Sequence, residues 1–371
     1  MIENLTCEVQ ALPRIPEESA QAYRDNLFFM VEQVNRIMTS RTDRHLLIGN
    51  NPVGMMLDNH KNHAVFMSNV FLFNRYELLL AVVPWVYRSY RNQGFAHAYF
   101  PAHLQAWKKV LSEHLPDQIN APLLQVYDWL LAHHEEFIAC SKNTSFLNIH
   151  ISAQWDDVVQ RFVRAVLQGD SKSSLSISRE HVTGPENLQE FYLQVIQPAM
   201  YLIGEKWEMG EISVAKEHLA SATVNRILAQ QYLEFMPAVE PTRPSVLVTT
   251  AANEFHEMGA QMVANTLELD GWAVQYLGAN TPNQDLLDLV HEKQPFILAM
   301  SIAMPFNLGS AQQIIGHIQG WPAENRPRIM LGGLALQTMP GLTQVLGADG
   351  YARDCQQAVD LARKWYREHT A

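Results

Sequence analysis

Short apolar runs alternate with amphipathic runs over the last third of the chain, and this alternation restricts the fold more than any other feature. The apolar runs cover residues 245–250, 272–277, 296–301 and 328–331, with a shorter one at 350–352. Helix-like runs follow at 257–270, 283–293, 308–319 and 338–346, and a last one ends near residue 368. Strands that are apolar on both faces and separated by helices are typical of a parallel sheet covered on both sides. We therefore predict a doubly wound, flavodoxin-like α/β domain over residues 243–371.

The preceding part of the chain is predicted to be all-helical, in two segments. Residues 1–148 lack strand-like alternation, and amphipathic runs cover 17–40, 61–91, 101–115 and 121–139. Residues 150–237 predict helices at 152–168, near 178, at 185–204 and at 212–235, which is enough for a four-helix bundle. Three prolines between residues 237 and 244 indicate a linker. The chain is thus expected to be multidomain.

Composition narrows the class of protein. A chain of 371 residues with 47% hydrophobic and 18% charged residues is expected to be soluble and globular. Its net charge of −11 disfavours nucleic acid as a partner, and no apolar run is long enough for a membrane span. We found no secretory signal, and Cys7, Cys140 and Cys355 show no metal-binding spacing, so a cytoplasmic location is expected.

Chemically distinctive residues follow three of the predicted strands. Glu254, His256 and Gly259 come directly after the first strand, Ser301 ends the third, and Gly332 and Gly333 follow the fourth. Ligands of doubly wound sheets bind at this edge. A histidine whose second ring nitrogen is held by a carboxylate can bind a metal, and glycines allow close approach to the backbone. Taken singly, each feature is explained by a surface loop, a strand-end cap or a turn, but their coincidence favours a ligand site.

Residues 245–371 resemble the cobalamin-binding domain of methionine synthase, corrinoid shuttle proteins and adenosylcobalamin mutases. The resemblance implies that His256 is the lower axial ligand of cobalt. It also implies that the dimethylbenzimidazole tail lies between Ser301 and the Gly332-Gly333 pair. Glu254 stands where the family has aspartate, and Ala303 where it has leucine.

The run 204–220 of the preceding segment resembles the helical cap of cobalamin-dependent, light-responsive transcription regulators. In that family a Trp, a Val seven residues later and a Glu-His pair enclose the adenosyl group; the matching residues are Trp207, Val214, Glu217 and His218. The resemblance implies adenosylcobalamin as cofactor. Glu208 replaces the histidine that captures cobalt after illumination, so a bis-histidine photoproduct formed in that way is not expected.

The first segment is rich in aromatic residues and histidines, without the basic DNA-binding module of those regulators. Such a segment can be a well-packed helical core, or it can hold a flat conjugated ligand. The combination of a helical domain of about globin size with the cobalamin-binding segments resembles the photocobilins, which pair adenosylcobalamin with a bilin. The resemblance implies biliverdin in a globin-like domain. No cysteine lies in an evident bilin-attachment context, so non-covalent binding is expected. Residues that could line it are Tyr87, Arg88, Arg91, His97 and His103. Haem is the competing ligand, with His97 or His103 as axial residues.

We therefore predict a photoreceptor and no enzyme. Light would cleave the cobalt–carbon bond and change self-association, and the signal would pass through quaternary structure or a separate effector protein. Three alternatives remain open: a corrinoid methyl carrier of a methyltransferase system, an adenosylcobalamin mutase subunit, and a haem-based sensor with a cobalamin domain. The mutase needs a substrate barrel, for which no eightfold βα pattern is present.

Overall fold

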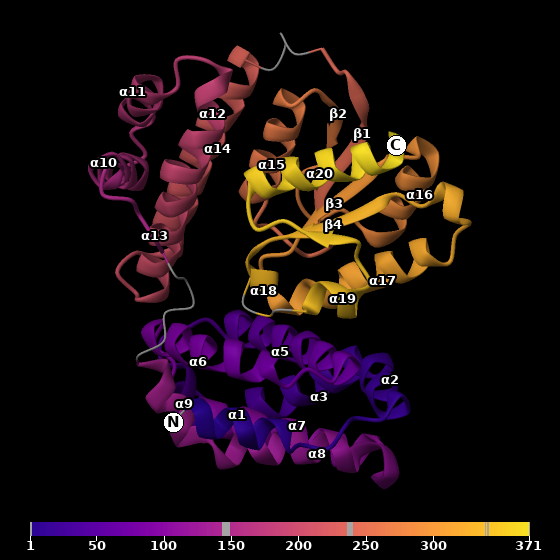
Figure 1. Cartoon of the computed structure of the whole chain (residues 1–371). Coiled ribbons are helices and arrows are strands. Elements are labelled where there is room, and N and C mark those ends of the chain that lie inside the picture. Colours follow the sequence, from indigo (N-terminus) through magenta and orange to yellow (C-terminus); the bar gives the residue numbers. More distant parts are fainter. Residues whose placement is uncertain (1, 143–148, 236–239, 338, 340, 371) are drawn as a thin grey trace. The chain divides into compact units, whose positions relative to one another are not determined.

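The computed structural model describes residues 2–142, 149–235, 240–337, 339 and 341–370. The chain divides into two compact units (Figure 1). The first contains residues 1–146 and the short segment 208–210, and the second contains 147–207 and 211–371. The described helices include none that is long and apolar enough to cross a membrane.

Helices make up the described part of the first unit, as predicted. Tertiary packing joins α3 with α5 and α7, and α6 with α9. The helices are α1 (Ile2–Gln10), α2 (Glu17–Asp25), α3 (Leu27–Ser40), α4 (Arg44–Ile48), α5 (Val53–Phe73), α6 (Glu77–Asn92), α7 (Tyr99–His114), α8 (Asp117–Ala132) and α9 (His134–Ser141).

The amphipathic run over residues 61–91 contains two helices, because the chain breaks between α5 and α6 at Asn74. Asn74 is left-handed, with φ of 51°. Its Oδ1 accepts the Ile15 N–H at 2.6 Å, and its Nδ2 donates to the Ile15 carbonyl at 3.1 Å. A contact with a residue 59 positions away therefore stabilises the break, and local periodicity does not reveal it. The amphipathic run over residues 17–40 likewise divides at Asn26.

The second unit begins with the helices of the predicted cap. They are α10 (Asp156–Leu167), α11 (Ser171–His181), α12 (Pro185–Phe191), α13 (Gln197–Glu208) and α14 (Val214–Phe235). A π-helical turn at Tyr192–Ile196 joins α12 to α13, so the predicted helix 185–204 is not uniform. Phe162, Phe191 and Leu228 are fully buried in one apolar core, to which Met262 of the α/β part also belongs.

Five parallel strands form the sheet of the second unit, in the order β2-β1-β3-β4-β5 (Figure 1). This order is that of the flavodoxin-like fold and confirms the predicted class. The strands are β1 (Arg243–Thr250), β2 (Trp272–Tyr276), β3 (Ile297–Ser301), β4 (Arg328–Gly332) and β5 (Gly350–Tyr351). The helices are α15 (Met258–Leu269), α16 (Asn283–Lys293), α17 (Leu308–Gln319), α18 (Leu334–Gln337), α19 (Leu342–Leu346) and α20 (Cys355–Thr370).

Helices cover both faces of this sheet (Figure 1). α15 packs with α20, and their buried residues share a core with β1, β3 and β4, whereas α16 packs with α17. Within the predicted helix 338–346 the structure has α19 at Leu342–Leu346, whereas α18 lies before that range, and residues 338 and 340 lie outside the described part.

The strand order reverses between β1 and β3, and the predicted site residues lie at that point. Thr250 of β1 is in register with Ser301 of β3, which is in register with Gly332 of β4. The carboxyl ends of three neighbouring strands therefore meet at one edge of the sheet, where ligands of this fold class bind.

Candidate functional site

His256 is held by Glu254 in the loop after β1. The ring Nδ1 lies 2.5 Å from Glu254 Oε1, and the His256 backbone N–H donates to the same oxygen at 3.1 Å. A carboxylate on Nδ1 selects the tautomer that carries its proton there, so the Nε2 lone pair is free for a metal. The His256 side chain is 65% exposed while that of Glu254 is 1% exposed, so the ligand faces outward from a buried support.

The buried Glu254 carboxylate is satisfied by donors from the loop after β3. Its Oε2 accepts the backbone N–H groups of Ala303 and Met304 at 2.9 and 2.8 Å and the Asn307 Nδ2 at 3.0 Å. Together with His256, these donors offset the loss of hydration that burial of a carboxylate causes. The β3 loop thus fixes the orientation of a histidine that belongs to the β1 loop.

The electrostatics of this pair favour a charged carboxylate. Burial alone would raise the pKa of Glu254, but the hydrogen bonds from His256, Met304 and Asn307 hold that pKa below its ordinary value. The Glu254 hydrogen bond raises the pKa of His256 against the effect of burial, and the charges of Glu254 and Glu217 add to the rise. Glu217 of α14 therefore lies within electrostatic reach of His256.

A second loop braces the His256 segment. Asn253 is left-handed, with φ of 63°, and its N–H donates to Asn280 Oδ1 at 2.8 Å. The Asn280 N–H donates to Thr250 Oγ1 at 3.0 Å, and that hydroxyl donates to the Glu254 carbonyl at 2.8 Å. These contacts within the protein fix the backbone on both sides of Glu254.

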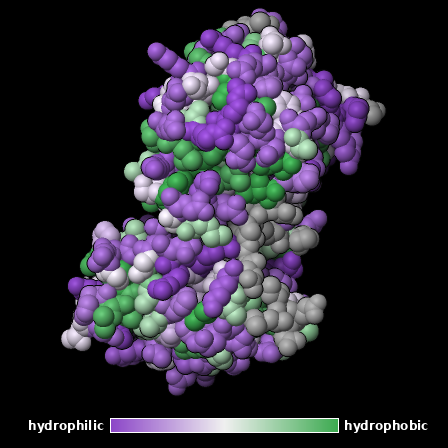
Figure 2. Space-filling model, turned by 90° about the vertical axis from the view of Figure 1, so that its left-hand side faces the viewer, coloured by the Kyte–Doolittle hydropathy of each residue, from purple (hydrophilic) through white to green (hydrophobic). Residues whose placement is uncertain are grey.

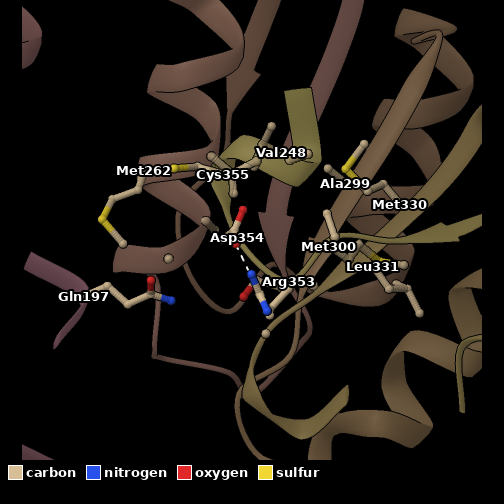
Figure 3. Close-up of a pocket in the computed structure, with 18 of the residues that line it drawn as sticks. Gln197, Val248, Met262, Ala299, Met300, Met330, Leu331, Arg353, Asp354 and Cys355 are labelled. Atoms are coloured by element: carbon tan, nitrogen blue, oxygen red, sulfur yellow. Dashed lines mark hydrogen bonds and ion pairs between the residues drawn. The ribbon is translucent and has the colours of Figure 1, made fainter. Parts of the chain in front are cut away.

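A pocket opens beside this edge, between the sheet, α15 and the cap (Figure 3). It encloses about 650 Å³ of empty space, including some open solvent. Figure 3 places Ala299, Met300, Met330 and Leu331 on one side, with Arg353, Asp354 and Cys355 beside them. Gln197 and Tyr201 of α13 line the cap side. The lining is mainly apolar, as an aromatic base requires.

The three predicted glycines of this pocket differ in why they suit it. Gly332 and Gly333 leave little room for a side chain, whereas Gly259 borders open space. Gly333 has φ of +98°, and a Cβ there would overlap the Ile302 carbonyl oxygen. A Cβ on Gly332 would lie 3.1 Å from the Ala352 carbonyl oxygen. A Cβ on Gly259 would meet nothing within 4 Å, so the space beside α15 is open. Ser301 lines the same pocket.

The predicted cap residues gather around the turn between α13 and α14. Trp207 lies near the end of α13, and Val214, Glu217 and His218 occupy the first turns of α14. Glu217 Oε2 lies 2.7 Å from His218 Nδ1, and Glu217 Oε1 accepts the Ser221 hydroxyl at 2.7 Å. Glu217 thus stabilises His218 in the way that Glu254 stabilises His256.

Large apolar side chains are exposed in the loop after β1 and on α14. Phe255 is 70% exposed next to His256, and Leu219 and Val214 are 45% and 41% exposed on α14. Figure 2 shows apolar residues gathered on one face of the second unit. Exposed apolar groups around a polar ligand pair are typical of a site for a large, partly apolar cofactor.

The predicted bilin residues of the first unit already have protein partners or lie at the surface. The Tyr87 hydroxyl is 2.9 Å from His134 Nδ1, and its ring stacks on Phe100. Arg88 is buried and paired with Glu208, whereas Arg91 is exposed. His97 is half-buried before α7.

His103, the fifth of these residues, belongs to a cluster of histidines in the interior. It accepts the Trp107 indole N–H at 2.8 Å, and its ring lies 4.8 Å from that of His60 and 4.6 Å from that of His63. Burial lowers the pKa of His60 to about 4 and keeps that of His103 well below its ordinary value. Among the described residues no group of three or more His, Cys, Asp or Glu is arranged to hold a metal ion.

Comparison with known proteins agrees with the site in the second unit. Two models described as "B12 binding domain" match residues 244–360 and 158–231. A stretch of 95 residues is 37% identical to the HTH-type transcriptional repressor CarA of Myxococcus xanthus, over 25% of this chain and 32% of the repressor. The chain therefore spans about a third of that relative's length.

Other similarities extend over more than half of the chain. The trimethylamine corrinoid protein of Methanosarcina barkeri is 20% identical over 210 residues, 56% of this chain and 95% of that protein. The structure of the monomethylamine corrinoid protein of the same organism covers 57% of this chain and 99% of its own, at 14% identity and a TM-score of 0.47.

The two domain matches make the chain a cobalamin-binding protein, and the geometry fits the cofactor. His256 offers a free Nε2, Gly259 leaves open space, and the pocket beneath is apolar. Sequence reasoning missed three contributors: Asn307 and Asn280, which hold the loop, and Phe255, which is exposed beside the ligand. A signal for Asn307 was present, since it follows the third strand by six residues, but amides there have many structural roles.

Proposed function

We propose that the protein is a photoreceptor that binds adenosylcobalamin. The observation that carries this proposal is the position of Glu217, which holds His218 at 2.7 Å and also raises the pKa of His256. The charge of Glu217 thus acts on His256, and we propose that the cap pair and His256 contact the same cofactor. Sequence similarity to a repressor of the light-responsive class supports the same reading.

Each residue has a role in this proposal. His256 would hold the cobalt of the cofactor through Nε2, and Glu254 would maintain the tautomer and orientation of the ring. Trp207 and Val214 provide an apolar lid, and Glu217 and His218 offer polar partners to a ribose or base. When bound, adenosylcobalamin would supply a cobalt–carbon bond that green light cleaves. Loss of the adenosyl group would remove the partner of Trp207 and release the cap.

The experiment is an absorption spectrum of the protein loaded with adenosylcobalamin in darkness, before and after green light. We expect conversion to a hydroxo- or imidazole-ligated spectrum. Trp207→Ala should weaken adenosylcobalamin about tenfold or more while hydroxocobalamin is unaffected. Trp321→Ala, in the same unit but outside these elements, is the control. Equal losses for both cobalamins, or a spectrum unchanged by light, would contradict the proposal.

The first unit is proposed to bind biliverdin without a covalent bond, in a globin-like arrangement of helices. The support is a dense set of stacked rings, including Tyr87 on Phe100 and His103 near Tyr99. Titration with biliverdin should give a red-shifted band, and titration with haem should give no Soret band. The reverse result would favour the haem-based sensor.

Signalling is proposed to pass through self-association and a separate effector, from a cytoplasmic protein without enzymatic activity of its own. Light scattering coupled to size-exclusion chromatography, in darkness and after illumination, should give two different masses. The same mass under both conditions would exclude a light-dependent assembly.

A corrinoid methyl carrier is the second candidate, favoured by the similarity over 95% of the trimethylamine corrinoid protein. This function predicts equal or tighter binding of methylcobalamin and a spectrum indifferent to green light in the presence of a methyltransferase. Repeating the Trp207→Ala titration with methylcobalamin separates the two candidates: a loss confined to adenosylcobalamin supports the photoreceptor, and an equal loss for methylcobalamin counts against it.

A further inference from the structure

The segment 208–210 belongs to a different compact unit from the residues on either side of it in the chain. Residues 207 and 211 belong to the second unit, whereas Glu208–Gly210 belong to the first. Lys206 and Glu211 close the base of this excursion: the Glu211 N–H donates to the Lys206 carbonyl, and their side chains form an ion pair, each at 2.9 Å. The tip of the turn between α13 and α14 is therefore fixed by contacts with the helices of the first unit.

Helix α6 provides those contacts. Arg88 Nε donates to Glu208 Oε1 at 2.6 Å, and Asn92 Nδ2 donates to the Glu208 carbonyl at 2.9 Å. Gly210 has φ of +73°, and a Cβ there would lie 3.2 Å from the Asn92 carbonyl oxygen. Both backbone and side chain of the segment are thus fixed against the end of one helix.

The Arg88–Glu208 ion pair is buried. The side chains are 8% and 4% exposed, and this separates the pair from the surface ion pairs elsewhere in the chain. A buried carboxylate without a cation is strongly unfavourable, so Glu208 depends on Arg88 for its place. Glu208 is the last residue of α13 and is joined by one peptide bond to Trp207.

We propose that Arg88 is a positioning residue for Trp207, acting through Glu208. The pair fixes the last turn of α13 and thereby the direction of the Trp207 side chain. The consequence for ligand binding rests on the role proposed above for Trp207, whereas the positioning itself does not. Arg88 then has a structural use that competes with the bilin contact predicted for it.

Hydrogen–deuterium exchange of the full chain without cobalamin tests the positioning directly. Arg88→Met should speed exchange of amides in residues 197–211 about tenfold, because a local contact that holds the turn is lost. Arg88→Lys, which keeps the charge, should restore most of the protection. Arg41→Met is the control, since it removes an arginine–carboxylate pair of the same unit that is more than one third exposed.

A double substitution separates the pair from general damage. Arg88→Met with Glu208→Leu removes both charges, so exchange of 197–211 should return toward the wild-type rate. If Arg88→Met does not fold, Glu208→Gln replaces it and should show a smaller rise. Unchanged exchange in a folded Arg88→Met protein, or in Glu208→Gln where that variant replaces it, would overturn the proposal.

A cobalamin titration tests the consequence for the ligand. Arg88→Met should weaken adenosylcobalamin about tenfold relative to hydroxocobalamin. If exchange rises but both cobalamins bind as in the wild type, the positioning is supported and the adenosyl role of Trp207 fails. The two hypotheses are therefore distinguishable in one set of variants.

Discussion

Histidines occur in two opposite environments in this protein. His256 in the second unit is 65% exposed and bonded to a buried carboxylate, which raises its pKa. His60 and His103 in the first unit are buried, and no described hydrogen bond joins them to a carboxylate. His63 keeps part of its surface exposed, yet its ring lies among Trp107, His103 and Tyr127, and desolvation lowers its pKa to about 3.

The difference shows what makes a histidine a ligand. The hydrogen bonds of the cluster are to neutral partners: Asn35 on His60 at 2.6 Å, Trp107 on His103 at 2.8 Å and Tyr127 on His63 at 3.2 Å. The buried Nε2 of His60 has no hydrogen-bond partner. These rings are neutral and part of the core. A ligand needs a charged support on one nitrogen and open space at the other, which His256 combines and His60, His63 and His103 do not. Abundance of histidine in the first unit is therefore poor evidence for a haem.

Acidification should produce the largest contrast between the two environments. The pKa values of His60 and His63 are lowered from 6.5 to about 4 and about 3, so the unfolded chain binds protons first. The stability they contribute is complete above pH 6.5 and is lost as pH falls toward 4. Between pH 7 and 5 the free energy of unfolding of the first unit should fall by about 4 kcal/mol.

The stability that His256 contributes depends on pH in the opposite direction. Because its pKa is raised, this stability is present below pH 6.5 and is lost as pH rises. A pH of 5 is, moreover, still above the ordinary carboxyl pKa of 4.5, and the pKa of Glu254 is lower than that, so Glu254 keeps its charge. Hydrogen exchange, corrected for the intrinsic effect of pH, should therefore show loosening of α5 and α7 but not of the 251–257 loop. His63→Phe should remove about half of the pH slope that His60 and His63 contribute together, and His45→Asn, at an exposed position, is the control. Equal loosening of both regions would remove the contrast.

The next largest effect is expected from replacing His256, the proposed axial ligand of cobalt. His256→Ala should weaken hydroxocobalamin by about 100-fold or more, since the loss exceeds that seen when a group behind a metal ligand is removed. The visible spectrum of the bound cofactor, titrated alongside, reports the axial ligand directly. His317→Ala on α17 is the control. A bound spectrum identical to the wild type would show that His256 is not on cobalt.

Removal of the charged support should have a smaller effect. Glu254→Gln should weaken cobalamin roughly 10- to 100-fold, because an amide NH₂ would face the N–H donors of Ala303, Met304 and Asn307 or lose the bond to His256. NMR titration of His256 should also show its pKa lower than in the wild type. If the affinity falls but this pKa does not, Glu254 acts on the loop and not on the imidazole.

The smallest effect is expected one contact further away. Asn307→Ala removes one of the donors on Glu254 and should weaken cobalamin about fivefold, equivalent to about 1 kcal/mol. Isothermal titration measures this directly, and Asn325→Ala, in the loop before β4, serves as the matched control. A loss as large as that of Glu254→Gln would mean that Asn307 itself contacts the cofactor.

Sequence reasoning was most accurate for the sheet. Near-continuous apolar runs marked all five strands to within about two residues, because burial on both faces leaves little choice of residue. Helix boundaries were less well predicted: the breaks at Asn26 and Asn74 and the π-helical turn after Phe191 interrupt runs that remain apolar. At Asn74 the deciding contact is with Ile15, and local periodicity contains no trace of it.

By itself, the sequence determined the order of elements, the α/β class of the second unit and the axial histidine candidate, because these depend on local periodicity and on residues close together in the chain. Only the tertiary structure decided that Ala303, Met304 and Asn307 converge on Glu254, that Glu217 acts on His256, and that Arg88 is committed to Glu208. Each of these depends on groups tens of residues apart, and whether they meet is set by how the helices and strands pack.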